Sequence, residues 1–375
     1  MRANPLDIAK QFNLTGDIQG VSPLGQGLIN DTFLVSTSPD PRTSVVLQRI
    51  NANVFPNPLA IIQNIQTLNK HLTQRRNAHV KPVTLCFPTL YQTMSGAHFA
   101  LDANGDYWRA ISYIPDTYNI EALSDITQAH AIGAALAEFH TMLQDIEISS
   151  LHTTLPGFHI APSYLAQYDQ LLALNKNLPP LNEWMDCADA VQRGRHHCDV
   201  LERAKQSGEL RLRPIHGDPK LDNFLFDRKS QKVISLIDLD TLQPGLIHYD
   251  IGDCIRSSCN SISESSQHIE DVQFNIDLCR SLLQGYYDAA SAMIEIPDIK
   301  YFYDAIRLIP WELGLRFLAD HLAGDLYFKV KQRGANLHRA RVQFKLVEEI
   351  ERQRADILDV TDQLCLLKKG SIARA

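Results

Sequence analysis

The hydrophobic and polar positions divide the chain into a strand-rich first third and a helical remainder. Short apolar runs at Leu28–Ser36 and Thr43–Ile50 surround a turn-forming Ser-Pro-Asp-Pro cluster, which predicts two strands. Between 58 and 72, leucine and isoleucine recur every three positions, as expected of an amphipathic helix. Two more strand-like stretches, 98–102 and 107–114, lie on either side of an Asn-Gly dipeptide that predicts a hairpin. The pattern therefore predicts a small antiparallel sheet with one helix.

From residue 125 the apolar spacing becomes helical. The stretch 125–143 has apolar side chains three and four positions apart, and Ser124 precedes it as the expected N-cap. Further helices are expected at about 162–176, 183–208, 267–290, 301–328 and 336–357, with one apolar strand at Val233–Asp240.

The run Pro115-Asp116-Thr117 ends the strand pattern and marks a predicted boundary. We expect an N-terminal lobe of residues 1–114, a hinge near 109–116 and a helical C-terminal lobe of residues 115–375. A chain of 375 residues is long enough to give each lobe its own core.

The composition is that of an ordinary globular protein, with 45% hydrophobic and 21% charged residues, which excludes wholesale disorder. A net charge of −7 gives no electrostatic basis for binding nucleic acid or an anionic membrane surface. The chain begins without a signal-peptide pattern and has no apolar run of membrane-spanning length. Its seven cysteines are scattered without CxxC spacing, which argues against a disulfide framework or a zinc site, so we expect a cytoplasmic protein.

The most informative segment, residues 214–227, reads PIHGDPKLDNFLFD and is followed by LIDLD at 236–240. Phosphoryl transfer needs a carboxylate at the acceptor hydroxyl, and an amide oxygen and a second carboxylate that hold Mg²⁺. Asp218 and Asn223 have the five-residue offset of a kinase-type catalytic loop, and Asp238 stands where the metal-binding Asp would stand. Each motif alone is common in turns and at strand ends, but their combination favours a phosphotransferase site.

HGDPKLDN followed by IDLD resembles the aminoglycoside-phosphotransferase superfamily, which shares the protein-kinase fold, and IGAALAEFH at 132–140 is similar to a helix of that superfamily. Other segments resemble N-acetylhexosamine 1-kinases: GQGLINDTFLV at 25–35 with LQRIN at 47–51, IDLDT at 237–241 with Pro244-Gly245, DIGDCIR at 250–256, and RFLAD at 316–320 with GDLYF at 324–328. The resemblance extends from about residue 8 to about residue 355. It implies an α+β, two-lobe, protein-kinase-like fold with a small antiparallel-sheet N-lobe and a larger helical C-lobe.

The resemblance also implies an activity: transfer of the ATP γ-phosphate, with Mg²⁺, to the anomeric hydroxyl of GlcNAc or GalNAc, giving the sugar 1-phosphate. Asp218 would be the catalytic base or orienting carboxylate, and Lys220 would neutralise phosphate charge. Asn223 and Asp238 would bind Mg²⁺. The residues expected at the nucleotide are Gly25, Gly27, Gln48 and Arg109, and those expected at the sugar are Asn30, Asp253, Arg256, Arg316 and Tyr327.

Several nucleotide-side positions keep a second interpretation. Gly25 and Gly27 could fold over the phosphates through backbone N–H groups, or could belong to an ordinary turn. Gln48 stands where a kinase strand places the Lys that grips the α- and β-phosphates, and strand alternation sends Arg49 to the opposite face. Residues 109–114 either read an adenine edge through backbone groups or form an ordinary edge strand.

The acceptor side has alternatives as well. Glu312, Arg316 and Asp320 share one helix face, so they are either sugar ligands or a solvated ladder of salt bridges. Asn30 could reach the sugar or the phosphates. His216 is expected to pack against the catalytic loop and orient it, because Asp218 already fills the role of base.

The function favoured by this pattern is an ATP- and Mg²⁺-dependent sugar 1-kinase acting on N-acetylhexosamines. The first alternative is a related small-molecule kinase for an aminoglycoside, choline, homoserine or methylthioribose. A cationic acceptor favours clustered carboxylates or an aromatic cage, whereas Arg256 and Arg316 would repel it. The second alternative is a catalytically silent nucleotide-binding scaffold, which only Gln48 supports. The preferred epimer and the oligomeric state stay open.

Overall fold

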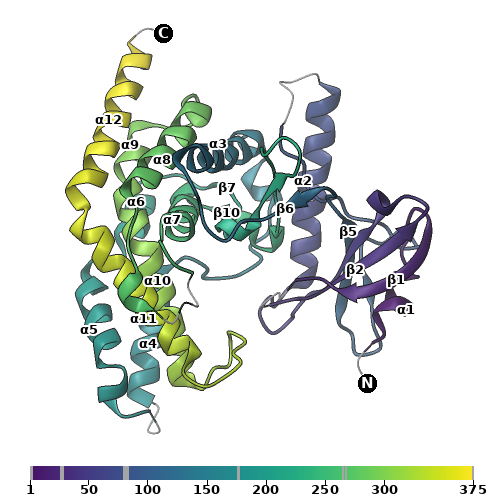
Figure 1. Cartoon of the computed structure of the whole chain (residues 1–375), viewed down its shortest axis with the longest axis horizontal. Helices are drawn as coiled ribbons and strands as arrows, with labels where there is room; N and C mark the ends of the chain where they lie inside the picture. Colours follow the sequence, from purple (N-terminus) through teal and green to yellow (C-terminus); the bar gives the residue numbers. More distant parts are fainter. Residues whose placement is uncertain are drawn as a thin grey trace.

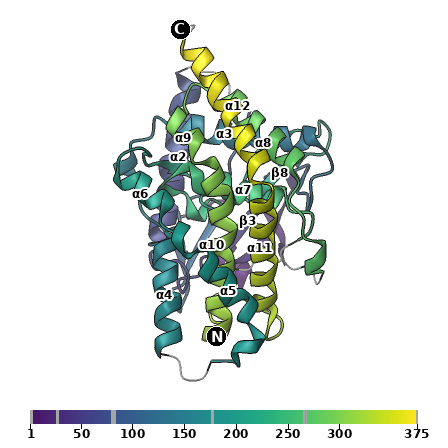
Figure 2. The same ribbon diagram turned by 90° about the vertical axis from the view of Figure 1, so that its left-hand side faces the viewer.

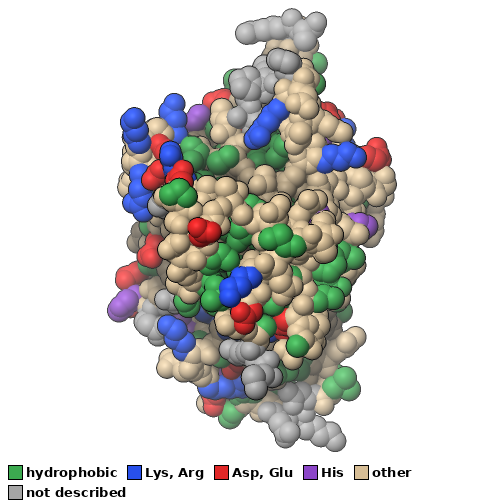
Figure 3. All heavy atoms as spheres, turned by 90° about the vertical axis from the view of Figure 1, so that its right-hand side faces the viewer, with side chains coloured by type: hydrophobic (Ala, Val, Ile, Leu, Met, Phe, Trp, Pro, Cys, Tyr) green, Lys and Arg blue, Asp and Glu red, His purple; other side chains and the backbone are tan. Residues whose placement is uncertain are grey.

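The computed structural model describes residues 3–25, 29–78, 84–174, 178–263, 266 and 268–373. A sheet near the N-terminus lies beside a larger helical part (Figure 1). This arrangement confirms the predicted α+β architecture, with a small antiparallel sheet and a larger set of helices. On the sheet side of the molecule, Lys and Arg side chains are interspersed with acidic ones (Figure 3).

The N-terminal sheet consists of β1 (Asp17–Pro23), β2 (Asp31–Ser38), β3 (Val45–Arg49), β4 (Ala100–Leu101) and β5 (Tyr107–Ser112). Its five strands are antiparallel and lie in the order β1-β2-β3-β5-β4. The predicted strands and the Asn-Gly hairpin are confirmed, whereas β1 escaped prediction because its mostly exposed residues do not alternate regularly. Helix α1 (Pro5–Ala9) packs on the sheet, where Ile8 shares a small core with Val35, Leu47 and Trp108.

The helical part consists of α3 (Ile126–Leu143), α4 (Ala161–Leu174), α5 (Met185–Gly194), α6 (Val200–Gln206), α7 (Ile247–Ser258), α8 (Ile276–Ala290), α9 (Ile296–Lys300), α10 (Phe302–Ala323), α11 (Ala335–Arg352) and α12 (Arg354–Ile372). Figure 2 looks onto this part and shows α4, α10 and α11 running in similar directions. Among the described residues, no helix combines the length and apolar character needed to cross a membrane.

Several predicted helix boundaries were wrong, and local capping explains them. Asp125 rather than Ser124 caps α3, because its carboxylate accepts the N–H groups of the first turn at 2.7 and 2.9 Å. Helix α8 begins nine residues later than predicted, after Asn275, whose side chain caps it. Helix α10 ends at Ala323 because Gly324 takes a left-handed φ of 101°. The stretch 183–208 forms α5 and α6 rather than one helix, and α1, α7, α9 and α12 were missed.

Two small sheets carry the polar motifs. One contains β6 (Thr117–Tyr118), β8 (Phe224–Asp227) and β9 (Val233–Leu236), and in the other β7 (Arg213–Ile215) pairs with β10 (Gln243–Gly245). The predicted strand Val233–Asp240 ends at Leu236, shortly before Asp238 takes a left-handed φ of 67°. Strands of three or four residues are too short to show a period of two, so β7, β8 and β10 were not predicted.

Helix α2 (Pro58–Asn77) joins the sheet to the helical part, as Figure 1 shows. Its buried Ile61 and Leu68 belong to the core of the helical part rather than to that of the sheet. Asn64 is fully buried and donates its Nδ2 to the carbonyls of His152 and Leu242, both at 2.7 Å. This helix is therefore anchored to the helical part, while the lobe boundary at residue 114 stays a prediction.

Helices α3 and α8 approach each other at two glycines. A Cβ at Gly133 would lie 1.9 Å from the carbonyl oxygen of Leu282, and one at Gly285 would lie 2.1 Å from that of His130. We expect Gly133→Ala and Gly285→Ala each to destabilise the protein by about 1–3 kcal/mol or more, because the helices must move apart. The measurement is the urea midpoint.

Gly370→Ala is the matched control, because Gly370 lies within α12 and a Cβ there meets nothing within 4 Å. Alanine favours a helix by about 1 kcal/mol over glycine, so this variant should be neutral or stabilised. An unchanged urea midpoint for Gly133→Ala would contradict the close approach of α3 and α8.

Candidate active site

The backbone of the catalytic loop, which follows β7, is held by a buried carboxylate. Asp250 on α7 accepts the N–H groups of His216 at 2.7 Å and Gly217 at 2.8 Å. Gly217 has a φ of 87°, and a Cβ there would lie 2.7 Å from the Cβ of Thr241. Only glycine fits this conformation and this close approach, so the loop leading to Asp218 has one defined path.

Asp250 is itself held by neighbouring helices. The Nε2 of His140, on α3, lies 2.9 Å from its carboxylate, and the Nδ1 of the same ring lies 2.8 Å from the hydroxyl of Tyr286 on α8. Both His140 and Asp250 are fully or almost fully buried. The catalytic loop is therefore positioned by the packing of α3, α7 and α8.

The segment that ends at Asp238 is joined to the catalytic loop through Ile237. The N–H of Ile237 donates to the carbonyl of Asn223 at 2.9 Å, and its carbonyl lies 2.9 Å from the Nε2 of His216. The Nδ1 of His216 accepts the N–H of Asp218 at 3.2 Å, so Nε2 is the donor to Ile237. These contacts agree with the orienting role expected for His216.

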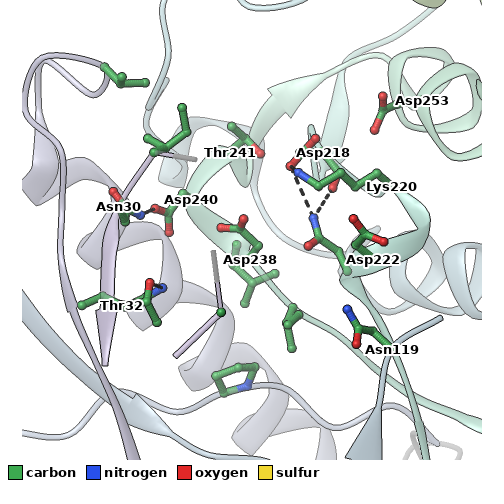
Figure 4. Close-up of a pocket in the computed structure, with 18 of the residues that line it drawn as sticks. Asn30, Thr32, Asn119, Asp218, Lys220, Asp222, Asp238, Asp240, Thr241 and Asp253 are labelled. Atoms are coloured by element: carbon green, nitrogen blue, oxygen red, sulfur yellow. Dashed lines mark hydrogen bonds and ion pairs between the residues drawn. The ribbon is translucent and has the colours of Figure 1, made fainter. Parts of the chain in front are cut away.

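Asp218 accepts hydrogen bonds from two side chains, and Figure 4 shows one of them, Lys220, beside it. Lys220 Nζ is 2.6 Å from Asp218 Oδ2, and Asn223 Nδ2 donates to the carbonyl of Asp218 at 2.7 Å and to its Oδ2 at 3.3 Å. Burial raises the pKa of Asp218, but the charge and hydrogen bond of Lys220 outweigh it and hold the pKa below its usual range. Asp218 is therefore an ionised acceptor facing the cavity.

The pKa of Asp238 is shifted in the opposite direction from that of Asp218. Its side chain is open to the cavity, yet protein surrounds it, and burial together with the negative charge of Asp240 raises its pKa to about 7. Among the described residues, its carboxylate makes no hydrogen bond or ion pair. The Nδ2 of Asn223 points to Asp218, which leaves its Oδ1 for a ligand. Mg²⁺ prefers oxygen donors, so this pair of residues fits a divalent cation.

A cavity of about 710 Å³ brings the predicted site residues together. Its walls include the following predicted residues: Gly25, Asn30, Gln48, Arg109, Asp218, Lys220, Asn223, Asp238, Asp253, Arg256, Arg316 and Tyr327. Gly27 lies outside the described residues. The cavity lies between the sheet and the helical part, so each side supplies one of its ends.

At the sheet end, the positive charge comes from Arg109 on β5 rather than from position 48 on β3. Gln48 and Arg109 are register partners, and Gln48 Oε1 accepts Arg109 Nε at 3.0 Å and Nη2 at 2.8 Å. Arg109 also forms a buried ion pair with Asp240, whose other oxygen accepts Asn30 Nδ2 at 2.6 Å. The Nη1 of Arg109 is buried without a partner among the described residues.

Arg49 faces away from this end, as strand alternation predicts. It pairs with Asp31 and, at 2.8 Å, with Asp106 on the other face of the sheet. Residues 110–112 of β5 pair with β3 on one side and form backbone hydrogen bonds to residues 89 and 91 on the other, so the edge-strand interpretation was wrong for this stretch.

At the helical end, each buried carboxylate faces one cation. Arg256 Nε lies 2.8 Å from Asp253 Oδ1 on α7, and His159 Nδ1 lies 3.1 Å from Glu312 Oε1 on α10. The second oxygens of Asp253 and Glu312 are buried and have no partner among the described residues. Because Glu312 is only 1% exposed, the interpretation as a solvated salt-bridge ladder was wrong.

Arg316 lies beside them on α10 and is surrounded by aromatic rings. Its guanidinium carbon lies 5.0–5.8 Å from the ring centroids of Phe158, Tyr164, Tyr327 and Phe328. The faces of these rings stabilise the charge, and Arg316 makes no hydrogen bond or ion pair among the described residues. Its hydrogen-bond donors are therefore left for a ligand.

Asp320, the third member of the predicted face, points elsewhere. Its carboxylate accepts the N–H groups of residues 326–328 at 2.8, 2.7 and 3.0 Å and the side chain of Asn336 at 2.9 Å. This loop then reaches the sheet side, where Lys329 Nζ lies 3.1 Å from the carbonyl of Ile29. Asp320 holds the loop that carries Tyr327 and does not line the cavity, so it is not a direct ligand.

Residues 20–289 match the phosphotransferase enzyme family, which covers well over half of the chain. The chain belongs to this family. It is therefore a phosphotransferase enzyme, and its sheet and helices form the kinase-like fold of that family.

Solved structures of other phosphotransferases share this fold at low sequence identity. An aminoglycoside phosphotransferase from Alicyclobacillus acidocaldarius has a TM-score of 0.63 at 14% identity, with 97% of each chain covered. A microcompartment-associated aminopropanol kinase has a TM-score of 0.62 at 15% identity, covering 93% of this chain and 96% of the other. A choline kinase from Cryptosporidium parvum has a TM-score of 0.59 at 14% identity, covering 92% and 93%.

Two residues of this phosphotransferase site were not predicted from the sequence. Asp240 lies two positions after Asp238, so the spacing contained a signal that a second carboxylate would be nearby. His159 comes from the loop before α4, which has no motif, and only folding brings it to Glu312 and Gly217.

The ion pair between Arg109 and Asp240 should contribute far more to the free energy of unfolding than the exposed pairs of the same sheet. Arg109→Met and Asp240→Asn each leave a buried polar partner without its counterpart, so we expect each to lower the free energy of unfolding by about 3–5 kcal/mol. The double variant should cost clearly less than the sum of the single variants. Urea unfolding of all three proteins measures this.

Arg49→Met and Asp31→Asn are the matched controls, since this pair lies on the same sheet with side chains 30% and 36% exposed. Such a pair contributes about 0–1 kcal/mol. Equal losses of unfolding free energy in the two sets of variants would contradict the special role of Arg109 and Asp240.

Proposed function

We propose that this phosphotransferase is an ATP- and Mg²⁺-dependent kinase that transfers the γ-phosphate to the anomeric hydroxyl of an N-acetylhexosamine, GlcNAc or GalNAc, giving the sugar 1-phosphate. The observation that carries the proposal is the arrangement of the cavity. Asp218 lines the same cavity as Asp238, a carboxylate without a partner among the described residues, and as Arg316, whose guanidinium is surrounded by aromatic rings. The choice of sugar rests on the resemblance of the motifs.

The charge of the acceptor pocket favours a neutral acceptor. Asp253 is paired with Arg256, and Glu312 is paired with His159, so neither carboxylate is left to attract a cation. Arg316 adds a further positive charge at the same end of the cavity. Choline and aminopropanol, the acceptors in the names of two structural relatives, are cations at neutral pH and would be repelled here.

At the sheet end, we assign to Arg109 the contact with the nucleotide phosphates that a kinase Lys makes. Protein kinases pair that Lys with a Glu on the following helix, but here Gln48 takes the Lys position and α2 contains no acidic residue. In this chain, Arg109 and Asp240 would take the places of that Lys and Glu. Residues 112–114 line the cavity where the sheet ends, and we place the hinge and the adenine contact there.

Asn223 and Asp238 would hold the Mg²⁺, which neutralises charge on the phosphate oxygens when it is bound. Asp218 accepts a hydrogen bond from the attacking hydroxyl of the sugar. This contact directs the oxygen of that hydroxyl toward the phosphorus. As the bond from oxygen to phosphorus forms and the bond to the leaving ADP breaks, the hydroxyl proton passes to Asp218. Because the lowered pKa makes Asp218 a weak base, its main contribution is orientation, which suits an acidic anomeric hydroxyl. Lys220 neutralises charge beside it.

ADP release with Mg-ATP tests the proposal across a panel of acceptors: GlcNAc, GalNAc, glucose, galactose, their 1-O-methyl glycosides, choline and kanamycin. We expect turnover with the free N-acetylhexosamines, and loss of turnover when the anomeric oxygen is methylated. Asp218→Asn should lower kcat by at least about a hundredfold, the usual contribution of a positioned acid or base.

Turnover of the 1-O-methyl sugars, choline or kanamycin would overturn the acceptor assignment. Near-full turnover by Asp218→Asn would overturn the role of that carboxylate. Mg-dependent ATP binding without transfer to any acceptor would favour a silent scaffold.

Arg109→Lys tests the nucleotide contact without removing the charge. The shorter side chain keeps an ammonium for Asp240 but loses the guanidinium nitrogen that has no partner among the described residues. We expect the KM for ATP to rise by about tenfold or more, as for the loss of one charge-assisted hydrogen bond, with the acceptor KM unchanged. An equal rise in both KM values would contradict the assignment.

A further inference from the structure

His159 connects the acceptor pocket to the catalytic loop. It lies just before α4, is 5% exposed and has a left-handed φ of 59°, which few residues other than glycine adopt. Its Nδ1 lies 3.1 Å from Glu312 Oε1, and its Nε2 lies 2.8 Å from the carbonyl oxygen of Gly217. The ring of Tyr249 stacks on it, with centroids 5.2 Å apart and planes 25° apart.

Both partners of this imidazole are hydrogen-bond acceptors. A neutral imidazole can donate from only one nitrogen, whereas the doubly protonated ring donates to both acceptors. Burial lowers the pKa of His159, but the negative charge and hydrogen bond of Glu312 outweigh it and raise the pKa above its usual value. His159 and Glu312 are thus a buried ion pair.

One end of this pair fixes the catalytic loop. The peptide group before Asp218 carries the Gly217 carbonyl, which accepts from His159, and the N–H of Gly217 donates to Asp250. The loop is therefore held on both sides of Gly217, from α7 and from the loop that precedes α4. A movement of His159 would shift the peptide that sets the direction of Asp218.

The other end of the pair opens on the cavity. Glu312 lines it, and its Oε2 is buried without a partner among the described residues. A buried carboxylate oxygen without a donor is costly, and native proteins rarely leave one in that state. A hydroxyl of the acceptor is the donor that this position would receive.

We propose that Glu312 binds a non-reacting hydroxyl of the acceptor, and that His159 is a positioning residue that couples this contact to the catalytic loop through the carbonyl of Gly217. The proposal rests on the proposed function, because it takes the helical end of the cavity as the acceptor site. Glu312 then selects acceptors by the presence of one particular hydroxyl, and His159 transmits that contact to Asp218.

The first experiment is steady-state kinetics of His159→Gln, Glu312→Gln and the double variant, using the sugar that the wild type phosphorylates best. We expect each single variant to lower kcat/KM for the acceptor by at least about tenfold, as for loss of a hydrogen bond to a charged group. The double variant should be close to the worse single variant, because the two residues act as one unit. The KM for ATP should stay within about twofold, since neither residue faces the sheet end.

The second experiment uses monodeoxy analogues of the same sugar. The wild type should discriminate against one of them by at least about tenfold, because its missing hydroxyl leaves Glu312 unpaired. Glu312→Gln should lose most of that discrimination while keeping its discrimination against the others. This pattern identifies a contact, since a merely structural defect would lower activity on all analogues alike.

His71→Gln is the matched control, because His71 Nε2 also lies 2.9 Å from a backbone carbonyl, that of Met142, but the residue does not line the cavity. It should keep the kinetics of the wild type. Thermal melting of all variants confirms that they are folded.

Three results would overturn this proposal but not the proposed function. The first is that the effects of the two substitutions on kcat/KM multiply in the double variant. The others are that Glu312→Gln discriminates among the monodeoxy analogues as the wild type does, or that the KM for ATP rises as much as the KM for the acceptor. A wild type that phosphorylates no sugar of the panel would overturn the proposed function and this proposal with it.

Discussion

The site depends on one buried ion pair, between Arg109 of the sheet and Asp240 of the helical part. The side chains of both residues are almost completely buried, so neither charge is satisfied by water. Gln48 and Asn30 supply the remaining hydrogen bonds of the pair from the sheet side. The interaction fixes β3 and β5 above the segment that carries Asp238, and the cavity exists between them because the two parts are held in this position.

Charge balance distinguishes the two ends of the cavity from Asp238. Arg109 and Asp240 neutralise each other at the sheet end, and Glu312 and His159 do so at the helical end. Asp238 is a carboxylate whose pKa is raised to about 7 and which has no hydrogen-bonding partner among the described residues. A carboxylate in that state can accept a cation, which is the basis of the magnesium site proposed above.

Rigidity of the catalytic loop comes from packing at a distance from the cavity. Asp250 receives two backbone N–H groups of the loop, while His140 and Tyr286 fix Asp250 from α3 and α8. The close approach of α3 and α8 therefore contributes to the position of Asp218. A phosphotransferase needs such positioning, because most of its catalysis is orientation and electrostatic stabilisation.

The sequence by itself determined what depends on neighbouring positions along the chain. The apolar periods predicted most of the sheet and most of the long helices, and the spacing of Asp218, Asn223 and Asp238 predicted a group of polar residues that the structure brings to one cavity. Helix ends and the short strands β7, β8 and β10 were missed, since capping side chains and short pairings leave little periodic signal.

Only the tertiary structure decided which distant residues meet. Nothing in the chain near Gln48 indicates that Arg109 supplies its missing charge, because the two are brought together by strand pairing. In the same way, His159 meets Glu312 and Gly217 across 153 and 58 positions of sequence, and Asp320 turns away from the cavity to hold a loop. Local periodicity carries no record of such contacts, because they arise from how complete elements pack against one another.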